Sequence, residues 1–201
     1  MSNYTNTPIV ELAAIVANHL QQYDIRVVLV GGLAVEIYSE NLYLTRDIDM
    51  VNISYDPPAA INQAMAAIGF SKQGRVYVND TTDICVEFPT APLSVGQELI
   101  HETTIVEVGS GEIPILLAKD VIKDRLVAYF HWNDRPSLVQ ALALMSNHFI
   151  GTEELKTFCL AEGKTGQYKI IVGLWRKVQQ KKLLTMEAIE ALVIEQTVQE
   201  I

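Results

Sequence analysis

Cysteine and long apolar runs are both scarce in this sequence. Cys85 and Cys159 are the only cysteines among 201 residues. Two cysteines are too few for a disulfide framework, and their spacing is not that of a metal knuckle. No stretch approaches the roughly 18 apolar residues of a membrane span, and the chain does not start with a basic segment followed by an apolar core. We therefore expect a soluble cytoplasmic protein, without a membrane partner and with both thiols reduced.

Basic charge is also in short supply. The chain has 15 Lys and Arg against 24 Asp and Glu, for a net charge of −9. An acidic surface repels phosphate groups, which disfavours RNA and other nucleic acids as general partners. One exception is the stretch from Lys164 to Lys182, which holds six basic residues and no acidic one. Such a run is usually a solvated helix face, although it leaves an anionic partner open.

The pattern of apolar residues divides the chain into two parts. Hydrophobic residues make up 49% and charged residues 19%, which is the balance of an ordinary globular protein. Strand patterns end near residue 117, and only helical patterns follow. We expect the α+β class, with an α/β core over residues 1–117 and a helical region over residues 118–201.

Apolar periodicity and turn residues place the individual elements. The predicted helices cover residues 9–23, 33–38, 58–69, 118–131, 135–149, 152–161, 166–181 and 185–199. The predicted strands cover residues 26–30, 47–53, 75–78, 83–88, 103–108 and 113–117.

The segment VVLVGGLAVEIYSENLYLTRDIDMV, residues 27–51, contains the most informative pattern. It reads as a buried strand, the pair Gly31-Gly32, a short helix, and then Asp-x-Asp on a second strand. Glycines after a strand let the backbone approach a ligand closely, and the N–H groups that open the next helix form an anion site. Gly31 and Gly32 are therefore candidates for binding phosphate.

Carboxylates form the second part of this pattern. Asp47 and Asp49 share one face of a strand, roughly 6–7 Å apart, and Glu87 on a neighbouring strand would lie about 5 Å away. Such hard oxygen ligands suit one or two Mg²⁺ ions, which can clamp the attacking and leaving oxygens in nucleotidyl transfer. Asp83 shares the strand face of Glu87 and competes for the third position. We prefer Glu87, because it is flanked by apolar residues where an uncompensated carboxylate is costly.

These motifs resemble the nucleotidyltransferase superfamily typified by DNA polymerase beta. That family shows Gly-Gly or Gly-Ser, then Asp-x-Asp, then a third carboxylate, and residues 26–88 match this order. More narrowly, Gly-Gly-Leu-Ala-Val and Leu-Thr-Arg-Asp-Ile-Asp look like small bacterial nucleotidyltransferase-like proteins grouped near AbiEii-type toxins, and the likeness extends to about residue 145. The resemblance implies a nucleotidyltransferase-type mixed sheet with flanking helices, an NTP co-substrate and bound Mg²⁺.

Several other residues are candidates for nucleotide contact. Thr45 can bind phosphate or serve simply as a strand former. Arg125 interrupts an apolar helix row, so its partner is either a nucleotide phosphate or an internal carboxylate. Lys119 and Lys123 fall on the polar side of that helix and are candidates only for triphosphate contact. Trp132 can stack on a base, but a core position is the commoner place for tryptophan.

Two functional hypotheses follow. In the first, the protein is a Mg²⁺-dependent enzyme that transfers a nucleotidyl group from an NTP to a small molecule, a tRNA or a protein. Asp47, Asp49 and Glu87 would bind metal, and Glu87 would also help deprotonate the acceptor hydroxyl. In the second, the chain is a non-catalytic binding protein of the same fold, such as a toxin–antitoxin component acting through a protein partner. The presence of all three carboxylates favours the first.

Overall fold

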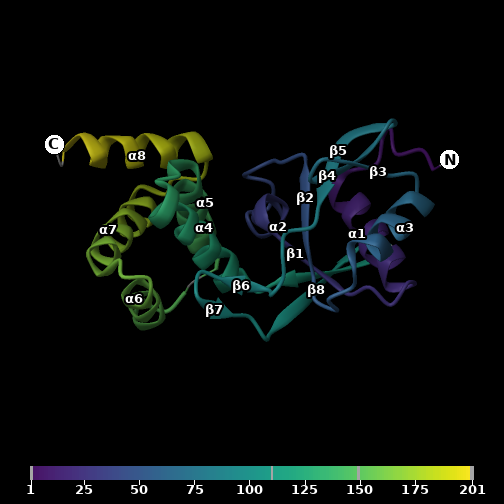
Figure 1. Cartoon of the computed structure of the whole chain (residues 1–201). Helices are drawn as coiled ribbons and strands as arrows, with labels where there is room; N and C mark the ends of the chain where they lie inside the picture. The colour runs from purple at the N-terminus through teal and green to yellow at the C-terminus, as the bar shows by residue number, and fades with distance from the viewer. Residues whose placement is uncertain (1, 110, 149, 200–201) are drawn as a thin grey trace. The chain divides into compact units, whose positions relative to one another are not determined.

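The computed structural model describes residues 2–109, 111–148 and 150–199 (Figure 1). This part of the chain contains a seven-stranded mixed sheet and eight α-helices, so the protein belongs to the α+β class. It forms two compact units. The first unit comprises the chain up to Ile37 together with Leu44–Ser94 and Leu99–Leu117. The second comprises Tyr38–Tyr43, Val95–Glu98 and the chain from Ala118 onward.

The large sheet has the strand order β3-β4-β5-β2-β1-β9-β8. Central strand β1 runs antiparallel to β2 and parallel to β9, while β2 runs parallel to β5. The remaining neighbours are antiparallel hairpin pairs. Its strands are β1 Val27–Val30, β2 Asp47–Asn52, β3 Ser71–Gln73, β4 Val76–Asn79, β5 Thr82–Glu87, β8 Thr103–Val108 and β9 Gly111–Leu116. The short strands β6 Ser94–Val95 and β7 Glu98–Leu99 pair separately.

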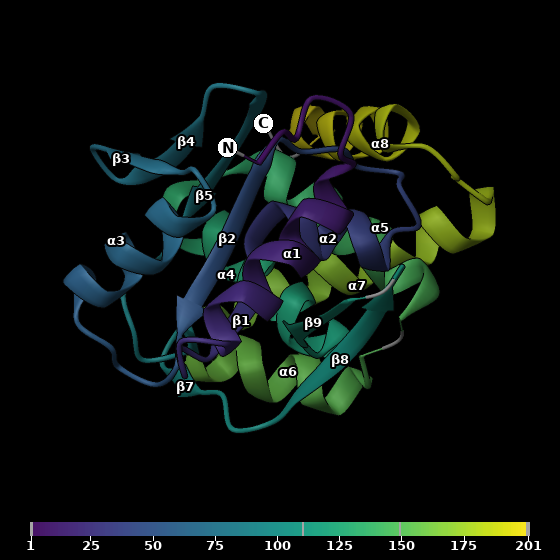
Figure 2. The same cartoon turned by 90° about the vertical axis from the view of Figure 1, so that its right-hand side faces the viewer.

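Three helices flank this sheet. Helices α1 (Ile9–Gln21) and α3 (Pro58–Ala67) lie on one face, and α2 (Gly31–Tyr38) lies on the other, as Figures 1 and 2 both show. The apolar side of α1 is fully buried through Leu12, Val16 and Leu20, and α1 packs on β9, β1 and α3. This burial of a helix stripe against a sheet provides the core of the first unit.

The second unit is helical around α5 (Arg135–Asn147). This helix packs against α4 (Ala118–Trp132), α7 (Thr165–Lys181) and α8 (Met186–Gln199), and every residue from position 137 to position 145 is buried. Helix α6 (Thr152–Ala161) packs on α7. Among the described residues, no helix combines the length and the apolar character required to cross a bilayer.

Candidate functional site

Strands β2 and β5 bring the predicted carboxylates side by side. In their parallel pairing, Asp49 is the register partner of Glu87, and Asp47 is the partner of Cys85. Neighbouring strands lie about 4.8 Å apart, and residues two positions apart on a strand share a face. Asp47, Asp49 and Glu87 therefore share one face of the sheet, opposite the fully buried Ile48.

Gly31 lies directly against the Asp49 carboxylate. Its φ of +67° falls in the left-handed region that favours glycine. A Cβ at this position would overlap the Oδ2 atom of Asp49. The preceding residue, Val30, is also the antiparallel register partner of Asp49. The glycine that follows β1 therefore leaves the space that the Asp49 carboxylate occupies, and Gly32 comes next as the second residue of α2.

Thr45 supports the start of β2. Its hydroxyl oxygen accepts a hydrogen bond from the Asp47 amide at 3.2 Å, and its own amide donates to the Glu36 carboxylate at 2.9 Å. Glu36 is buried in α2. This role of Glu36 was not predicted from the sequence, although one charged residue inside the apolar run LAVEIY was a usable signal. Through these two hydrogen bonds, Thr45 and Glu36 position the backbone at Asp47.

Arginines neighbour both competing third carboxylates. Asp83 forms an ion pair with Arg46 near the start of β5, where both side chains are largely exposed. Glu87 lies opposite Asp49, with Arg75 Nε 3.7 Å from its Oε1 atom. The register therefore associates Glu87, rather than Asp83, with the Asp-x-Asp pair.

The donor set suits a hard divalent cation. Asp47, Asp49 and Glu87 supply carboxylate oxygens, which Mg²⁺ prefers. Within residues 2–109, 111–148 and 150–199, no three Asp, Glu, His or Cys side chains already converge as a metal-binding group. Binding of Mg²⁺ would therefore require rotation of these carboxylates toward a common point, which their shared face permits.

Arg125 belongs to the second unit and has an internal partner. Its Nε and Nη2 atoms lie 3.0 and 2.5 Å from Asp124 Oδ2 on the same helix. The side chain is only 20% exposed. Of the two partners considered for Arg125, a nucleotide phosphate and an internal carboxylate, this contact provides the second.

Two expectations for α4 were wrong. Trp132 was expected in the core, but it is 74% exposed where the helix ends. Lys123 was expected on the polar side of α4, but it is only 4% exposed. The residues around Lys123 come from helix α6 and the β6–β7 hairpin. The spacing of apolar residues within α4 cannot predict contacts with these other elements.

Carboxylates surround the buried Lys123 ammonium. Its Nζ lies 3.1 Å from Glu154 Oε1, 3.2 Å from Glu98 Oε2 and 3.8 Å from Asp120 Oδ1. Burial lowers the pKa of Lys123, but the hydrogen bonds to Glu154 and Glu98 outweigh it, so the pKa is raised. Burial raises the pKa of Asp120 despite the opposing pull of Lys123. Both pKa values are raised, which favours the charged form of Lys123 and the neutral form of Asp120. Lys123 is therefore charged at neutral pH.

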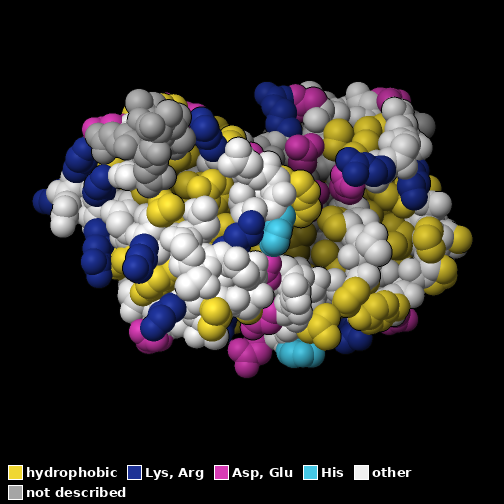
Figure 3. Space-filling view, turned by 60° about the vertical axis from the view of Figure 1, so that its left-hand side comes forward, with side chains coloured by type: hydrophobic (Ala, Val, Ile, Leu, Met, Phe, Trp, Pro, Cys, Tyr) yellow, Lys and Arg dark blue, Asp and Glu magenta, His cyan; other side chains and the backbone are white. Residues whose placement is uncertain are grey.

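The basic stretch of α7 is largely solvated. Lys169, Arg176 and Lys181 are exposed, and Lys181 Nζ lies 4.0 Å from Glu195. Lys177 donates to the Gln196 side chain at 2.6 Å. Figure 3 shows Lys and Arg side chains at separate positions on the visible surface. The stretch is therefore a solvated helix face with local partners on α8.

Comparison of the sequence with protein-family models and with curated proteins finds no match in either. The resemblance to nucleotidyltransferases therefore rests on the motif residues themselves. Their arrangement is the basis for a functional proposal.

Proposed function

We propose that the first unit contains a Mg²⁺-dependent nucleotidyl-transfer site on a nucleotidyltransferase-type fold. The observation that carries this proposal is the position of Asp49. Its carboxylate packs on Gly31, and its backbone lies opposite Glu87 in the parallel β2–β5 pair. The glycine after β1, the Asp-x-Asp pair of β2 and Glu87 of β5 thus lie on one face of the sheet.

Each residue would have a distinct role. Asp47 and Asp49, with Glu87, would hold Mg²⁺, which supplies neutralisation of the phosphate charge. Gly31 and Gly32 open α2, and the backbone N–H groups of this first turn would bind the phosphates. Glu87 would accept the proton of the acceptor hydroxyl.

The reaction balances with an NTP and an alcohol as substrates. The acceptor oxygen forms a bond to the α-phosphorus of the NTP. The bond from that phosphorus to the bridging oxygen breaks, and pyrophosphate leaves. The acceptor is a small molecule, a tRNA or a protein, and the chain's net charge of −9 favours the first and third.

Calorimetric titration of each NTP, with and without Mg²⁺, tests the proposal before an acceptor is known. We expect the native protein to bind at least one NTP only with Mg²⁺, and Asp47→Asn/Asp49→Asn to abolish that binding. Glu107→Gln/Glu112→Gln is the matched control, because these two exposed carboxylates are register partners on the same sheet. NTP binding that survives the Asp47 and Asp49 changes would overturn the proposal.

A non-catalytic role is the second candidate. The observation that favours it is the pairing of carboxylates on this face with arginines, Asp83 with Arg46 and Glu87 with Arg75. A carboxylate whose charge is neutralised by an arginine does not need a metal ion to compensate it. Absence of binding to every NTP, together with a stoichiometric protein that co-purifies, would support a partner-binding protein.

A further inference from the structure

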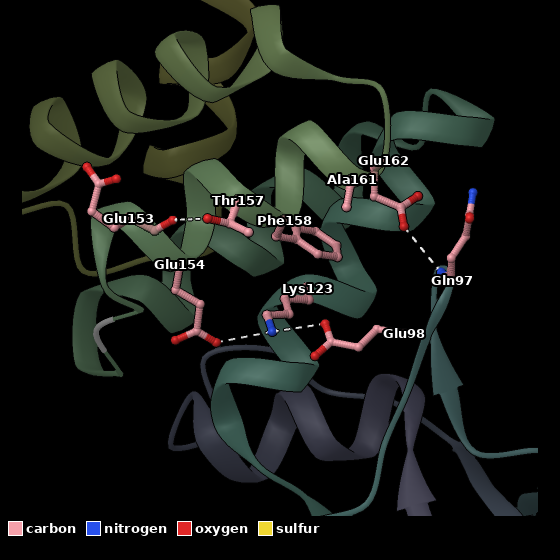
Figure 4. A pocket seen from close by; sticks show the side chains of 9 residues that line it. All are labelled: Gln97, Glu98, Lys123, Glu153, Glu154, Thr157, Phe158, Ala161 and Glu162. Atoms are coloured by element: carbon pink, nitrogen blue, oxygen red, sulfur yellow. Dashed lines mark hydrogen bonds and ion pairs between the residues drawn. The ribbon is translucent and has the colours of Figure 1, made fainter.

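A cavity of about 560 Å³ lies wholly within the second unit (Figure 4). Helix α4 contributes Lys123, helix α6 contributes Glu154 and Phe158, and the β6–β7 hairpin contributes Glu98. This volume lies within the range of roughly 300–1,000 Å³ typical of small-molecule sites. The site proposed for nucleotide binding does not use this cavity.

One part of the cavity already holds an ammonium group. The Lys123 Nζ is bound by the Glu154 and Glu98 carboxylates and lies 5.7 Å from the centre of the Phe158 ring. Figure 4 shows Lys123 between these two carboxylates. Carboxylates combined with an aromatic face are the chemistry that recognises organic ammonium ions. The protein's own lysine therefore shows which charge this cavity accepts.

Negative charge remains after Lys123 is counted. Glu98, Glu153, Glu154 and Glu162 all line the cavity, against the single lysine. Glu162 is fixed in place, because its carboxylate accepts a hydrogen bond from the Gln97 amide at 3.3 Å and lies 2.8 Å from His131 Nε2. The Glu153 side chain is 85% exposed, and Lys156 Nζ is 3.8 Å from its carboxylate, beyond hydrogen-bond distance. The wall thus has a surplus of acceptors for ammonium donors.

The distribution of these carboxylates favours an extended cation over a metal ion. In the described part of the chain, no three Asp, Glu, His or Cys side chains come together as a metal-binding group. Lys123 lies between Glu98 and Glu154, so those two cannot close on a single ion. A ligand with several separated ammonium groups can reach carboxylates on different walls.

We propose that this cavity binds a small organic polycation with two or more ammonium groups, of the aliphatic polyamine or amino-sugar type. Its ammonium groups pair with Glu98, Glu153 and Glu154, and its carbon chain or ring packs beside Phe158. Binding here is independent of the nucleotide-transfer proposal.

Calorimetric titration of the full chain with spermidine, and separately with the amino sugar neamine, tests this site. We expect saturable 1:1 binding at low ionic strength to at least one of them, and the preferred probe identifies the ligand type. Glu98→Gln/Glu153→Gln should weaken binding about tenfold or more, because two charged hydrogen-bond acceptors are lost. Glu187→Gln/Glu190→Gln, an equal charge change on exposed positions of α8, should change binding less than about twofold.

Three results would overturn the proposal. They are a lack of saturable binding to either probe, equal weakening by the α8 control, and displacement of the probe by equimolar Mg²⁺. Thermal melting of each variant verifies that it is folded. Asp47 and Asp49 do not line the cavity. The double variant Asp47→Asn/Asp49→Asn should therefore bind spermidine as the native protein does. Failure of one site therefore remains distinguishable from failure of the other.

Discussion

Two constraints favour glycine at position 31, a positive φ and a close neighbouring side chain, and comparison with Gly74 separates them. Its φ is +67°, and a Cβ there would overlap Asp49 Oδ2. Gly74 has a similar φ of +63°, but a Cβ added there would meet nothing within 4 Å. We expect Gly74→Ala to cost about 1–2 kcal/mol, from backbone strain alone. Gly31→Ala should cost more, because the Asp49 carboxylate must also move.

Urea unfolding of both glycine variants measures this difference, and nucleotide titration measures its effect on the site. Equal loss of stability in the two variants would show that the close approach to Asp49 has no energetic weight. Loss of NTP binding in Gly31→Ala, but not in Gly74→Ala, would connect the approach to function.

The two thiols provide a second residue-scale prediction. Cys159 is fully buried, and burial raises its pKa to about 11, so it is protonated and shielded at neutral pH. Cys85 is partly exposed on β5. We expect iodoacetamide at pH 8 to label Cys85 first and Cys159 only after denaturation, as peptide mass spectrometry would show. Prompt labelling of Cys159 in the folded protein would contradict this.

At the scale of elements, Lys123 links α4, α6 and the β6–β7 hairpin. Replacing it with Met leaves Asp120 buried without its cation, which should cost about 3–5 kcal/mol. The double variant Asp120→Asn/Lys123→Met removes both charges and should recover part of that loss. Urea unfolding of the two single variants and the double variant measures the coupling. Strict additivity of the two changes would show that the pair is not coupled.

These ionisations also predict a pH dependence. The folded pKa of Lys123 lies above its ordinary value of 10.5, so its stabilisation is complete below that pH and is lost as pH rises through the folded pKa. The folded pKa of Asp120 is raised above 3.8, so its protonation favours the folded state as pH falls toward that value. We expect Asp120→Asn to remove this acid-side gain, measured as the difference in melting temperature between the variant and the native protein across pH 4–7.

Periodicity predicted the long elements but not their surroundings. The helices and longer strands occur where the apolar spacing placed them, since most of them bury a stripe or an alternating face. Strand β3 was missed because Ser71–Gln73 is exposed at a sheet edge and shows no alternation. The neighbours of Lys123 were missed because they come from other elements. The register of Asp49 with Glu87 follows the predicted strand faces, whereas its contact with Gly31 depends on a backbone φ that spacing does not report.

At the scale of the whole molecule, two ligands should protect different segments. With Mg²⁺ and a bound NTP, we expect slower amide hydrogen exchange in β1, α2, β2 and β5, and little change in α6. Spermidine should give the opposite pattern, with protection in α6 and the β6–β7 hairpin. Hydrogen exchange followed by mass spectrometry measures both. Protection of the same segments by both ligands would contradict the assignment of two sites.

The strand order β3-β4-β5-β2-β1-β9-β8 also has a consequence for how the chain acquires its structure. Strand β2 meets β5 only after α3, β3 and β4 have intervened in the sequence, and β1 meets β9 later still. Pairings between segments distant in sequence form more slowly than local ones. The carboxylates therefore cannot assemble on the nascent amino-terminal segment, and a partly synthesised chain that ends before β5 carries Asp47 and Asp49 without the strand that completes their site.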